Sequence, residues 1–332
     1  MRAALLPTPG DPFMLSYWLR NYETLREYVD ELVVVQNGVQ TPEVVEYDRR
    51  IVEAVGGRFV TFPQSIGHDG AMLWLLQNTS ADHIVMCEDD AYVRHPEKVA
   101  WAFGLIESGA TDLVGSPRHE DYVTSPLMEW GPYTPGDLAE LRHGLWPAFL
   151  FARKDDLLTT DRIFGDRAWP RGGHIEGWGP VTPEACDYIG IAAEFVHLDT
   201  FFGTTFQLRA KGLRTELVHH VRVYDAAATE AWLAEDPPWF HVTNLSTINY
   251  VLDGTPIEQI PDCGPGGGLW TRRVAWWLRC WQMTTDAPGT QSYISALTNF
   301  LDRAQISDAN LDAWSHVLGA WVTWQDRVAV IA

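Results

Sequence analysis

Three consecutive acids, Glu88, Asp89 and Asp90, end an apolar run that begins at Ile84. The apolar run predicts a buried strand, so the acids lie at its carboxyl end, where open α/β sheets bind their ligands. Adjacent carboxylates repel one another unless a cation compensates their charge. A divalent metal carrying a diphosphate would do so, because hard cations prefer oxygen ligands and often retain phosphate oxygens. An acidic loop that merely follows a strand is the alternative.

The first 115 residues predict an alternation of strands and helices. Asp11 and Thr41 each precede a proline and are expected to cap helices, and another helix begins at Pro96. Alternation of this kind favours an α/β fold with a mainly parallel, doubly wound sheet flanked by helices. The expected strands are residues 2–6, 32–35, 58–62, 84–87 and 112–115, with a short helix over about 70–78.

The pattern becomes less regular after residue 116. The expected elements there are a short helix at 136–142, a strand at 148–151, a long loop at 164–185, a helix over 200–211 and a strand at 214–218. Long loops inside a compact domain are usually functional or disordered. We therefore predict one domain over residues 1–262 and a helical extension over residues 263–332. The helices of the extension are expected after the Gly-rich segment Gly264–Gly268. A Trp-rich apolar stripe from Trp314 to Val328 predicts packing, on the main domain or on a second subunit in a homodimer.

Composition narrows the function classes. The chain has 332 residues, of which 46% are hydrophobic and 20% charged, which suits a globular fold. Its net charge of −20 argues against tight binding to nucleic acid or to an anionic membrane, since both use Lys and Arg. No run of about 18 apolar residues predicts a membrane span. The cysteines, which form no CxxC pair, indicate free thiols and a cytoplasmic location: Cys87, Cys186, Cys263 and Cys280.

The acidic triplet, in its place after three strand–helix units, resembles a known motif. Glu88-Asp89-Asp90, followed by Ala91-Tyr92-Val93 and a helix that begins with proline, is similar to the EDD form of the DxD motif in GT-A fold glycosyltransferases, the N-acetylglucosaminyltransferase-like enzymes in particular. The resemblance covers roughly residues 1–225. It implies a Rossmann-like GT-A fold with a donor half over residues 1–115, an acceptor half over residues 116–262, and Mn²⁺ or Mg²⁺ as cofactor. No GxGxxG motif follows the first strand, which argues against a dinucleotide-binding domain.

The same resemblance implies roles for residues of the donor half. Asp90 would be the direct metal ligand, while Glu88 and Asp89 would contact metal-bound water or the ribose and sugar of the donor. Asn37 would bond the base or ribose, although a plain Asn-Gly turn is the alternative. The remaining donor positions are Pro7 and Thr8 in the nucleotide pocket, and His68, Asp69 and Gly70 over the nucleoside and diphosphate, where a helix start offers N–H groups to phosphate. For Asp69 a simple helix cap is the alternative.

Residues of the acceptor half are assigned in the same way. Asp199 would be the general base that deprotonates the acceptor hydroxyl in an inverting transfer, with Glu194 as second choice. Asp199 is equally a good helix N-cap. His220 and His241 are rivals as a further metal ligand. In the Gly-rich segment 172–179, Trp178 and Glu176 would contact the acceptor, although Trp178 as a core anchor is the alternative.

The sequence thus predicts a metal-dependent glycosyltransferase that moves a sugar from a nucleotide-diphosphate donor, a UDP-sugar first, to a hydroxyl of a small molecule or glycan. A sugar-nucleotide nucleotidyltransferase is a second interpretation, but the Gly-rich basic loop of those enzymes is missing after the first strand. A catalytically silent carbohydrate-binding protein on the same fold is a third. The acidic triplet argues against that third interpretation.

Overall fold

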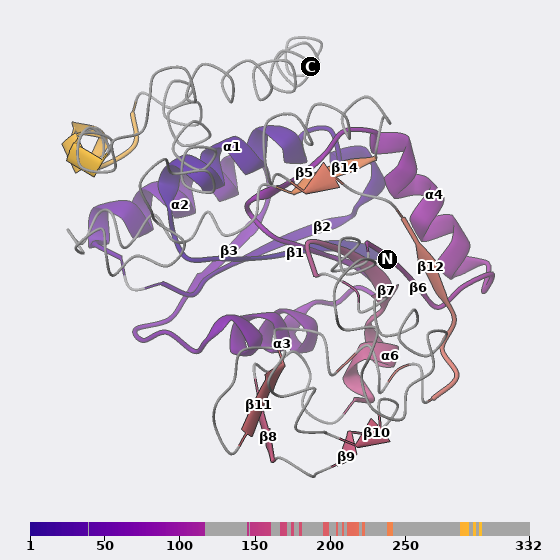
Figure 1. The fold of residues 1–332 in the computed structure, drawn as a ribbon. Coiled ribbons are helices and arrows are strands. Elements are labelled where there is room, and N and C mark those ends of the chain that lie inside the picture. Colours follow the sequence, from indigo (N-terminus) through magenta and orange to yellow (C-terminus); the bar gives the residue numbers. More distant parts are fainter. Residues whose placement is uncertain are drawn as a thin grey trace, which may run out of the picture.

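The computed structural model places seven strands of the described residues in one sheet, with helices packed on both of its faces (Figure 1). It describes residues 1–38, 40–116, 145, 147–160, 167–170, 174–175, 179–180, 195–198, 204, 208, 211–218, 221–222, 238–241, 286–291, 295–296 and 299–300. Among the helices within these residues, none is both long and apolar enough to cross a membrane.

The sheet is mixed and mainly parallel. Its strand order is β12-β6-β7-β4-β1-β2-β3, and four of its six neighbouring pairs are parallel. β7 is the exception, because it runs antiparallel to both β4 and β6. The bounds are β1 (Arg2–Thr8), β2 (Glu31–Gln36), β3 (Arg58–Thr61), β4 (His83–Cys87), β6 (Leu113–Gly115), β7 (Phe149–Arg153) and β12 (Thr215–Leu217). The predicted α/β class, a mainly parallel sheet flanked by helices, is confirmed.

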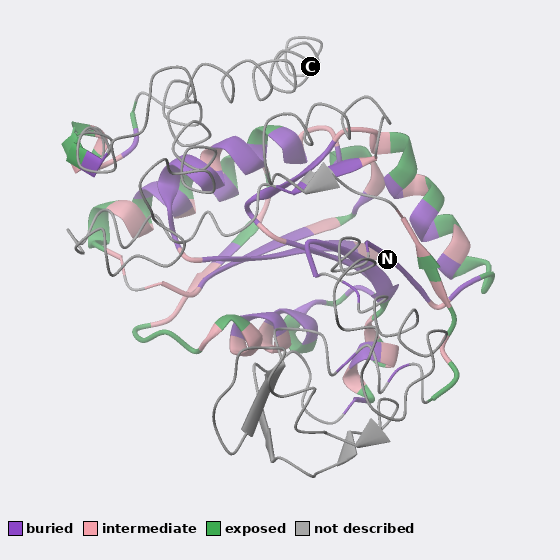
Figure 2. Cartoon of the chain, viewed as in Figure 1, coloured by how far each residue is buried: buried purple, intermediate pink, exposed green. Residues whose placement is uncertain are grey.

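Helices cover the sheet from two sides. α1 (Pro12–Tyr22), α2 (Pro42–Ala54) and α4 (Pro96–Glu107) lie on one face, and α3 (His68–Asn78) and α6 (Lys154–Leu158) lie on the other (Figure 1). Successive residues of a strand point to opposite faces. Leu6 and Val34 therefore pack under α1 and α2, whereas Leu5 and Val33 pack under α3. Burial on both faces explains why the central strands read as continuous apolar runs (Figure 2).

A second, three-stranded sheet lies beside the end of β4. It consists of β5 (Ala91–Val93), β14 (Trp239–His241) and β13 (Val221–Arg222), with β14 in the middle. β14 runs antiparallel to β5, in a register that pairs His241 with Ala91. The chain segment that follows the acidic triplet is thereby joined to a strand about 150 residues later in the sequence.

Most local predictions in the first 115 residues are confirmed, and their caps explain why. Asp11 accepts hydrogen bonds from the N–H groups of Phe13 and Met14 at the start of α1, and Thr41 accepts one from Val44 at the start of α2. The short strand β5, the one-turn helix α6 and a 3₁₀ turn at Arg26–Tyr28 were not predicted.

The prediction of one long loop over residues 164–185 is wrong. That segment contains β8 (Arg167–Pro170), which pairs antiparallel with β11 (Phe195–Leu198), and the pair β9 (His174–Ile175) and β10 (Gly179–Pro180). These strands are two to four residues long, which is too short for an alternating pattern to show in the sequence. Their partners, not their composition, make them strands. The helix expected at 136–142 lies outside the described residues.

The described residues between 286 and 300 pack against the main domain, with hydrogen bonds to α2. Ala287 and Phe300 are buried in the same apolar cluster as the residues under α1 and α2. Asp286 accepts a hydrogen bond from the Tyr47 hydroxyl at 3.3 Å and one from Arg50 at 3.2 Å. The Trp-rich stripe from Trp314 to Val328 lies outside the described residues, so the predicted homodimer contact stays a prediction.

Candidate metal centre

Two acids of the triplet and one histidine converge at the carboxyl end of β4. One ligand atom each from Glu88, Asp90 and His241 lies within 4.8 Å of the other two. The Nε2 atom of His241 is 3.0 Å from Asp90 Oδ1 and 3.3 Å from Glu88 Oε2. The His241 side chain is only 2% exposed, and Asp90 is also buried. Within the described part of the chain, this is the one group of three or more such side chains close enough to share a metal ion.

Local structure around the triplet brings these side chains together. Cys87 ends β4, and the N–H of Ala91 donates to the carbonyl oxygen of Glu88 at 3.1 Å, which closes a tight turn over the acids. The chain then enters β5, whose pairing with β14 places His241 opposite Ala91, directly after Asp90. The N–H groups of Arg94 and His95 donate to the carbonyl oxygen of Pro238, which anchors the start of β14 as well.

Helix α1 holds this turn from the other side. The Asn21 amide makes two hydrogen bonds with the backbone of Val93 in β5: Oδ1 accepts from its N–H at 2.8 Å and Nδ2 donates to its carbonyl at 2.9 Å. The Tyr92 hydroxyl donates to the carbonyl oxygen of Asp89 at 2.9 Å. The ring of Tyr17 packs edge-on against that of Tyr92, at 5.0 Å between centroids. Side chains of α1 therefore fix the backbone that carries Asp90.

The charges of the site shift the pKa of the histidine. Burial acts to lower the pKa of His241, because an imidazolium ion is poorly solvated in the interior. The negative charge of Asp90 and the hydrogen bonds to Asp90 and Glu88 act in the opposite direction, and the pKa is raised overall. In this arrangement a positive charge, whether a proton or a metal ion, stabilises two carboxylates that would otherwise repel each other.

The Asp89 side chain does not join Glu88 and Asp90 at His241 but contacts Thr8 of β1. It is 6% exposed, and its Oδ2 atom accepts a hydrogen bond from the Thr8 hydroxyl at 2.7 Å. The Thr8 oxygen in turn accepts from the N–H of Gly10 at 3.1 Å, which aims the hydroxyl proton at Asp89. Burial first, and the neighbouring charge of Asp90 second, raise the pKa of Asp89 well above its usual value, while the Thr8 bond opposes them. Thr8 and Asp89 thus form a buried hydrogen-bonded pair beside the group of Glu88, Asp90 and His241.

The amino end of α3 lies against the same acids. His68 begins the helix, and its Nε2 atom is 3.8 Å from Glu88 Oε1. The N-cap is Gly67, whose φ of 79° favours glycine and whose added β-carbon would lie 2.6 Å from Asp69 Oδ1. Asp69 lies in the first turn, two residues after the N-cap, so the predicted alternative of Asp69 as the helix N-cap is wrong. The first N–H groups of α3, including that of Gly70, point out of the helix end, as at any helix start.

Asn37 fixes the loop before α3. Its Oδ1 atom accepts hydrogen bonds from the N–H of Ile66 at 2.9 Å and from the Ser65 hydroxyl at 3.4 Å. Pro7 pairs with Val35 at the carboxyl end of β1, one residue before Thr8. The predicted donor residues Pro7, Thr8, Asn37, His68, Asp69, Gly70, Glu88 and Asp89 therefore gather along the carboxyl ends of β1, β2 and β4 and the start of α3.

The side chains present fit a divalent cation. Two carboxylates and one imidazole offer two oxygens and one nitrogen from a buried, fixed frame. A mixed oxygen and nitrogen set suits Mn²⁺, and Mg²⁺ is accepted where oxygen ligands dominate. Among the rival histidines, His241 meets the acids, whereas His220 lies outside the described residues. The described residues also do not include Asp199, Glu194, Trp178 or Glu176.

Sequence reasoning missed three buried polar residues near the site. Asn21 lies on a helix face that is otherwise apolar, and Asp48 and Gln36 lie between α2 and β2. A polar residue at a position where the helical period expects an apolar one was the available signal for Asn21 and Asp48. Nothing in the local pattern indicated their partners.

Comparison with known proteins gives matches to solved structures alone. No protein-family model and no curated protein matches the sequence. Glucosyl-3-phosphoglycerate synthase from Mycobacterium tuberculosis, solved with Mn²⁺ and UDP-glucose, is 22% identical over 48% of this chain, with a TM-score of 0.37. The mannosyltransferase PcManGT from Pyrobaculum calidifontis, solved with GDP-Man and Mn²⁺, is 14% identical over 97% of this chain, with a TM-score of 0.46.

The two matches differ in how much of the known protein they include. The alignment covers 58% of the mycobacterial synthase and 75% of the archaeal mannosyltransferase. Both TM-scores lie below 0.5 and both identities below 25%, so neither match bears on the reaction of this chain. What the chain does must be argued from its own site.

Proposed function

We propose that this chain is a metal-dependent glycosyltransferase that uses a nucleotide-diphosphate sugar. One observation carries the proposal: Glu88, Asp90 and His241 form a cation-binding group at the carboxyl end of a central strand, with the amino end of α3 beside it. Open α/β sheets bind their ligands at this edge. A cation there would sit next to a helix start that favours phosphate, and this combination suits a diphosphate.

The roles of the described residues follow from their positions. Glu88, Asp90 and His241 would hold the cation, which when bound offsets charge on the diphosphate and on the departing nucleoside diphosphate. His68 and the first N–H groups of α3 would bind phosphate oxygens, with Asp69 and Gly70 in the same turn. Pro7, Thr8 and Asn37 would border the nucleoside, and Asp89 would keep the acidic turn in place. A UDP-sugar is the first candidate donor, and Mn²⁺ the first candidate cation.

The acceptor side of the proposal rests on the sequence. Asp199 would take the proton from the acceptor hydroxyl as its oxygen attacks the anomeric carbon, which gives inversion, and Glu194 is the second choice. Trp178 and Glu176 would contact a small-molecule or glycan acceptor, and His220 would be the rival of His241 as a further ligand of the cation. The boundary between the donor and acceptor halves at residue 115, the separate extension from residue 263 and a cytoplasmic location belong to the same proposal.

Donor binding is tested by thermal unfolding of the wild-type protein with UDP-, GDP- and dTDP-sugars, each with and without Mn²⁺. A ligand that binds the folded state raises the melting temperature, by the equivalent of about 2.7 kcal/mol when present at a hundred times its Kd. We expect one of these nucleotide sugars to raise the melting temperature, and only when Mn²⁺ is present. The proposal is wrong if no nucleotide raises the melting temperature with any divalent metal.

Two variants make this experiment specific. Asp90→Ala should abolish the Mn²⁺-dependent shift. Asp82→Ala changes an exposed acid at the opposite end of β4 and should leave the shift intact. Equal loss in both variants would mean that general acidity, and not the group around Asp90, attracts the metal.

The assignment of the base needs a separate measurement. Asp199→Asn should abolish sugar transfer while the Mn²⁺-dependent thermal shift of the donor is retained. Near-normal turnover in this variant would move the role to Glu194 or indicate a retaining mechanism, and the proposal for the donor site would stand unaffected.

A further inference from the structure

A carboxyl group and an amide face each other in the interior between α2 and the end of β2. Asp48 and Gln36 are both 0% exposed, and Gln36 Nε2 donates to Asp48 Oδ2 at 3.3 Å. The second carboxyl oxygen of Asp48, Oδ1, and the amide oxygen of Gln36, Oε1, have no hydrogen-bond partner within the described residues. Buried polar atoms are nearly always bonded, so two adjacent exceptions require an explanation.

An ionised Asp48 would be strongly disfavoured here. Both orphan atoms would be acceptors without a donor, and a buried charge without a counter-ion is costly. The titratable groups that act on Asp48 are the acids Asp11 at the start of α1 and Asp89 after β4, and neither supplies a positive charge. Burial first, and these two charges second, raise the pKa of Asp48 from 3.8 to about 8. Apart from the Gln36 amide N–H, which donates to Oδ2, no described group favours the carboxylate.

We infer that Asp48 carries a proton on Oδ1 and forms a two-hydrogen-bond acid–amide pair with Gln36, and that this neutral pair supports the turn at Gly10 beside the acidic triplet. The proton supplies the missing donor: Oδ1–H bonds Gln36 Oε1 while Gln36 Nε2–H bonds Asp48 Oδ2. One proton thus satisfies both orphan oxygens and removes the buried charge.

The pair reaches the acidic triplet through a short series of contacts. A β-carbon on Gly10 would lie 2.3 Å from Gln36 Nε2, so the turn rests directly on the amide, and its φ of 89° also favours glycine. The N–H of Gly10 bonds the Thr8 hydroxyl oxygen, and that hydroxyl donates to Asp89. Asp48 and Gln36 are therefore positioning residues, and Gly10 and Thr8 lie between Gln36 and Asp89 in this series. The inference stands whether or not the chain transfers sugar.

The proton is observed directly by infrared difference spectroscopy at pH 6 between wild type and Asp48→Asn. The substituted asparagine keeps the shape and can make both hydrogen bonds, with its amide as donor to Gln36 Oε1. The subtraction also removes the signal of Asp89, whose pKa is raised too. We expect the wild type to show one additional carbonyl band of an un-ionised carboxylic acid. An additional carboxylate band in its place would overturn the inference.

The pH dependence of stability gives a second readout. Asp48 is ionised in the unfolded chain above a pH of about 4 and protonated in the folded chain up to about 8, so the folded state binds one more proton between these values. Stability contributed by the pair is complete below pH 4 and is lost as the pH rises toward 8. The unfolding constant of wild type should therefore rise against that of Asp48→Asn by up to about tenfold per pH unit in this window. Parallel curves would contradict the proton.

The positioning role is tested with Mn²⁺ alone, as the electron paramagnetic resonance signal of the free ion. Asp48→Ala should weaken Mn²⁺ binding by about tenfold, at the low end for outer-shell partners, while Asp48→Asn rescues it. Unchanged binding in Asp48→Ala would refute the positioning role and leave the proton in place. Failure of wild type itself to bind Mn²⁺ would instead refute the proposed metal site. Should Asp48→Asn not fold, the assigned ¹³C carboxyl resonance of Asp48 in wild type must titrate near pH 8, and titration near pH 4 overturns the inference.

Discussion

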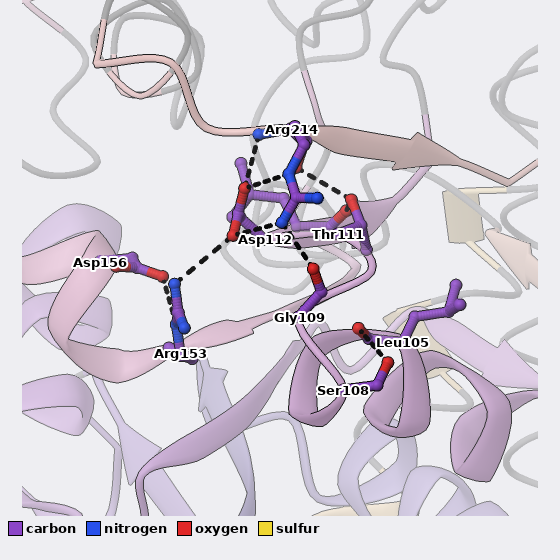
Figure 3. A network of polar contacts seen from close by, with 9 residues as sticks. Leu105, Ser108, Gly109, Thr111, Asp112, Arg153, Asp156 and Arg214 are labelled. Atoms are coloured by element: carbon purple, nitrogen blue, oxygen red, sulfur yellow. Dashed lines mark hydrogen bonds and ion pairs between the residues drawn. The ribbon is translucent and has the colours of Figure 1, made fainter.

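Two clusters of charged residues lie at opposite ends of the strands of the main sheet, and their negative charges are compensated in different ways. The first is the acidic cluster at the carboxyl ends of β1, β2 and β4. The second lies at the amino end of β6, where Asp112 meets Arg214 and Arg153, and Arg153 also meets Asp156 (Figure 3). The acidic cluster is largely buried, and its basic partners among the described residues are two histidines, the buried His241 and the more exposed His68. The second cluster is half-exposed and balanced between two acids and two arginines.

The balanced cluster joins the last strands of the sheet. Asp112 Oδ2 accepts from the Arg214 backbone N–H at 2.8 Å and from its Nε at 3.1 Å, and Arg214 Nη2 donates to the carbonyl oxygen of Gly109 at 2.7 Å (Figure 3). Hydrogen bonds from Arg214 lower the pKa of Asp112. The charges of this cluster therefore balance at neutral pH without a further ion. Its hydrogen bonds hold β12 beside β6.

The pKa values of the acids in the two regions are shifted in opposite directions. Arginine partners lower the pKa of Asp112, whereas burial and like charges raise the pKa of Asp48 and Asp89. An acid that is paired in place stabilises the fold by itself, but a group of buried acids remains short of positive charge. That shortage can be met by protons or by a metal ion, and this is what marks the acidic cluster as a functional site.

The largest expected effect compares the same chemical change at both clusters. Asp90→Asn removes a charged ligand and should weaken Mn²⁺ binding by more than about 100-fold, because loss of a direct ligand exceeds the 10–100-fold typical of outer-shell partners. Asp112→Asn should leave Mn²⁺ affinity unchanged. Titration of Mn²⁺ followed by the resonance of the free ion measures both. Similar affinities in the two variants would remove the functional distinction between the clusters.

An intermediate effect is expected at Asn21, which holds β5 beside the acidic cluster. Asn21→Ala leaves both backbone groups of Val93 without partners, at about 1–3 kcal/mol for each unsatisfied group. It should also weaken Mn²⁺ binding about tenfold, because the backbone next to Asp90 is released. Val52→Ala, a buried site on α2 away from β5, is the control for lost stability.

The two variants are compared by urea unfolding and by Mn²⁺ titration. Both should lose stability, with Val52→Ala in the usual range of about 0.5–3 kcal/mol for a core substitution. Only Asn21→Ala should lose Mn²⁺ affinity. Equal Mn²⁺ affinity in both would show that β5 keeps its place without the amide.

The smallest effect is expected in the balanced cluster itself. Asp112→Asn should lower the free energy of unfolding by about 1 kcal/mol at pH 7, and by less in concentrated salt, because partly exposed ion pairs contribute little and are screened. The pKa of Asp112 is lowered in the folded state, so its contribution is present above a pH of about 4 and is lost as the pH falls below it. Unfolding in urea at pH 7 and pH 3, with and without salt, measures this. A loss that is independent of salt would mean that Asp112 acts by packing.

The sequence predicted the elements of the first 115 residues well because local signals and long-range packing agree there. Capping residues such as Asp11 and Thr41, proline at the helix starts and continuous apolar strands each have a local physical cause. The position of Glu88 and Asp90 at a strand end followed from the same pattern. The short strands β8 to β10 did not, because strands of two to four residues form only through their pairing partners.

The sequence by itself determined which side chains were available at the carboxyl edge of the sheet and that Glu88, Asp89 and Asp90 would lie there. Only the tertiary structure decided how they are used. The pairing of β5 with β14 selected His241 as their partner. The packing of β1 beside β4 placed Thr8 against Asp89, and the packing of α2 on the sheet placed Asp48 against Gln36. The physical reason is that charge compensation depends on distances between residues far apart in the chain, and such distances are set by packing and not by local sequence.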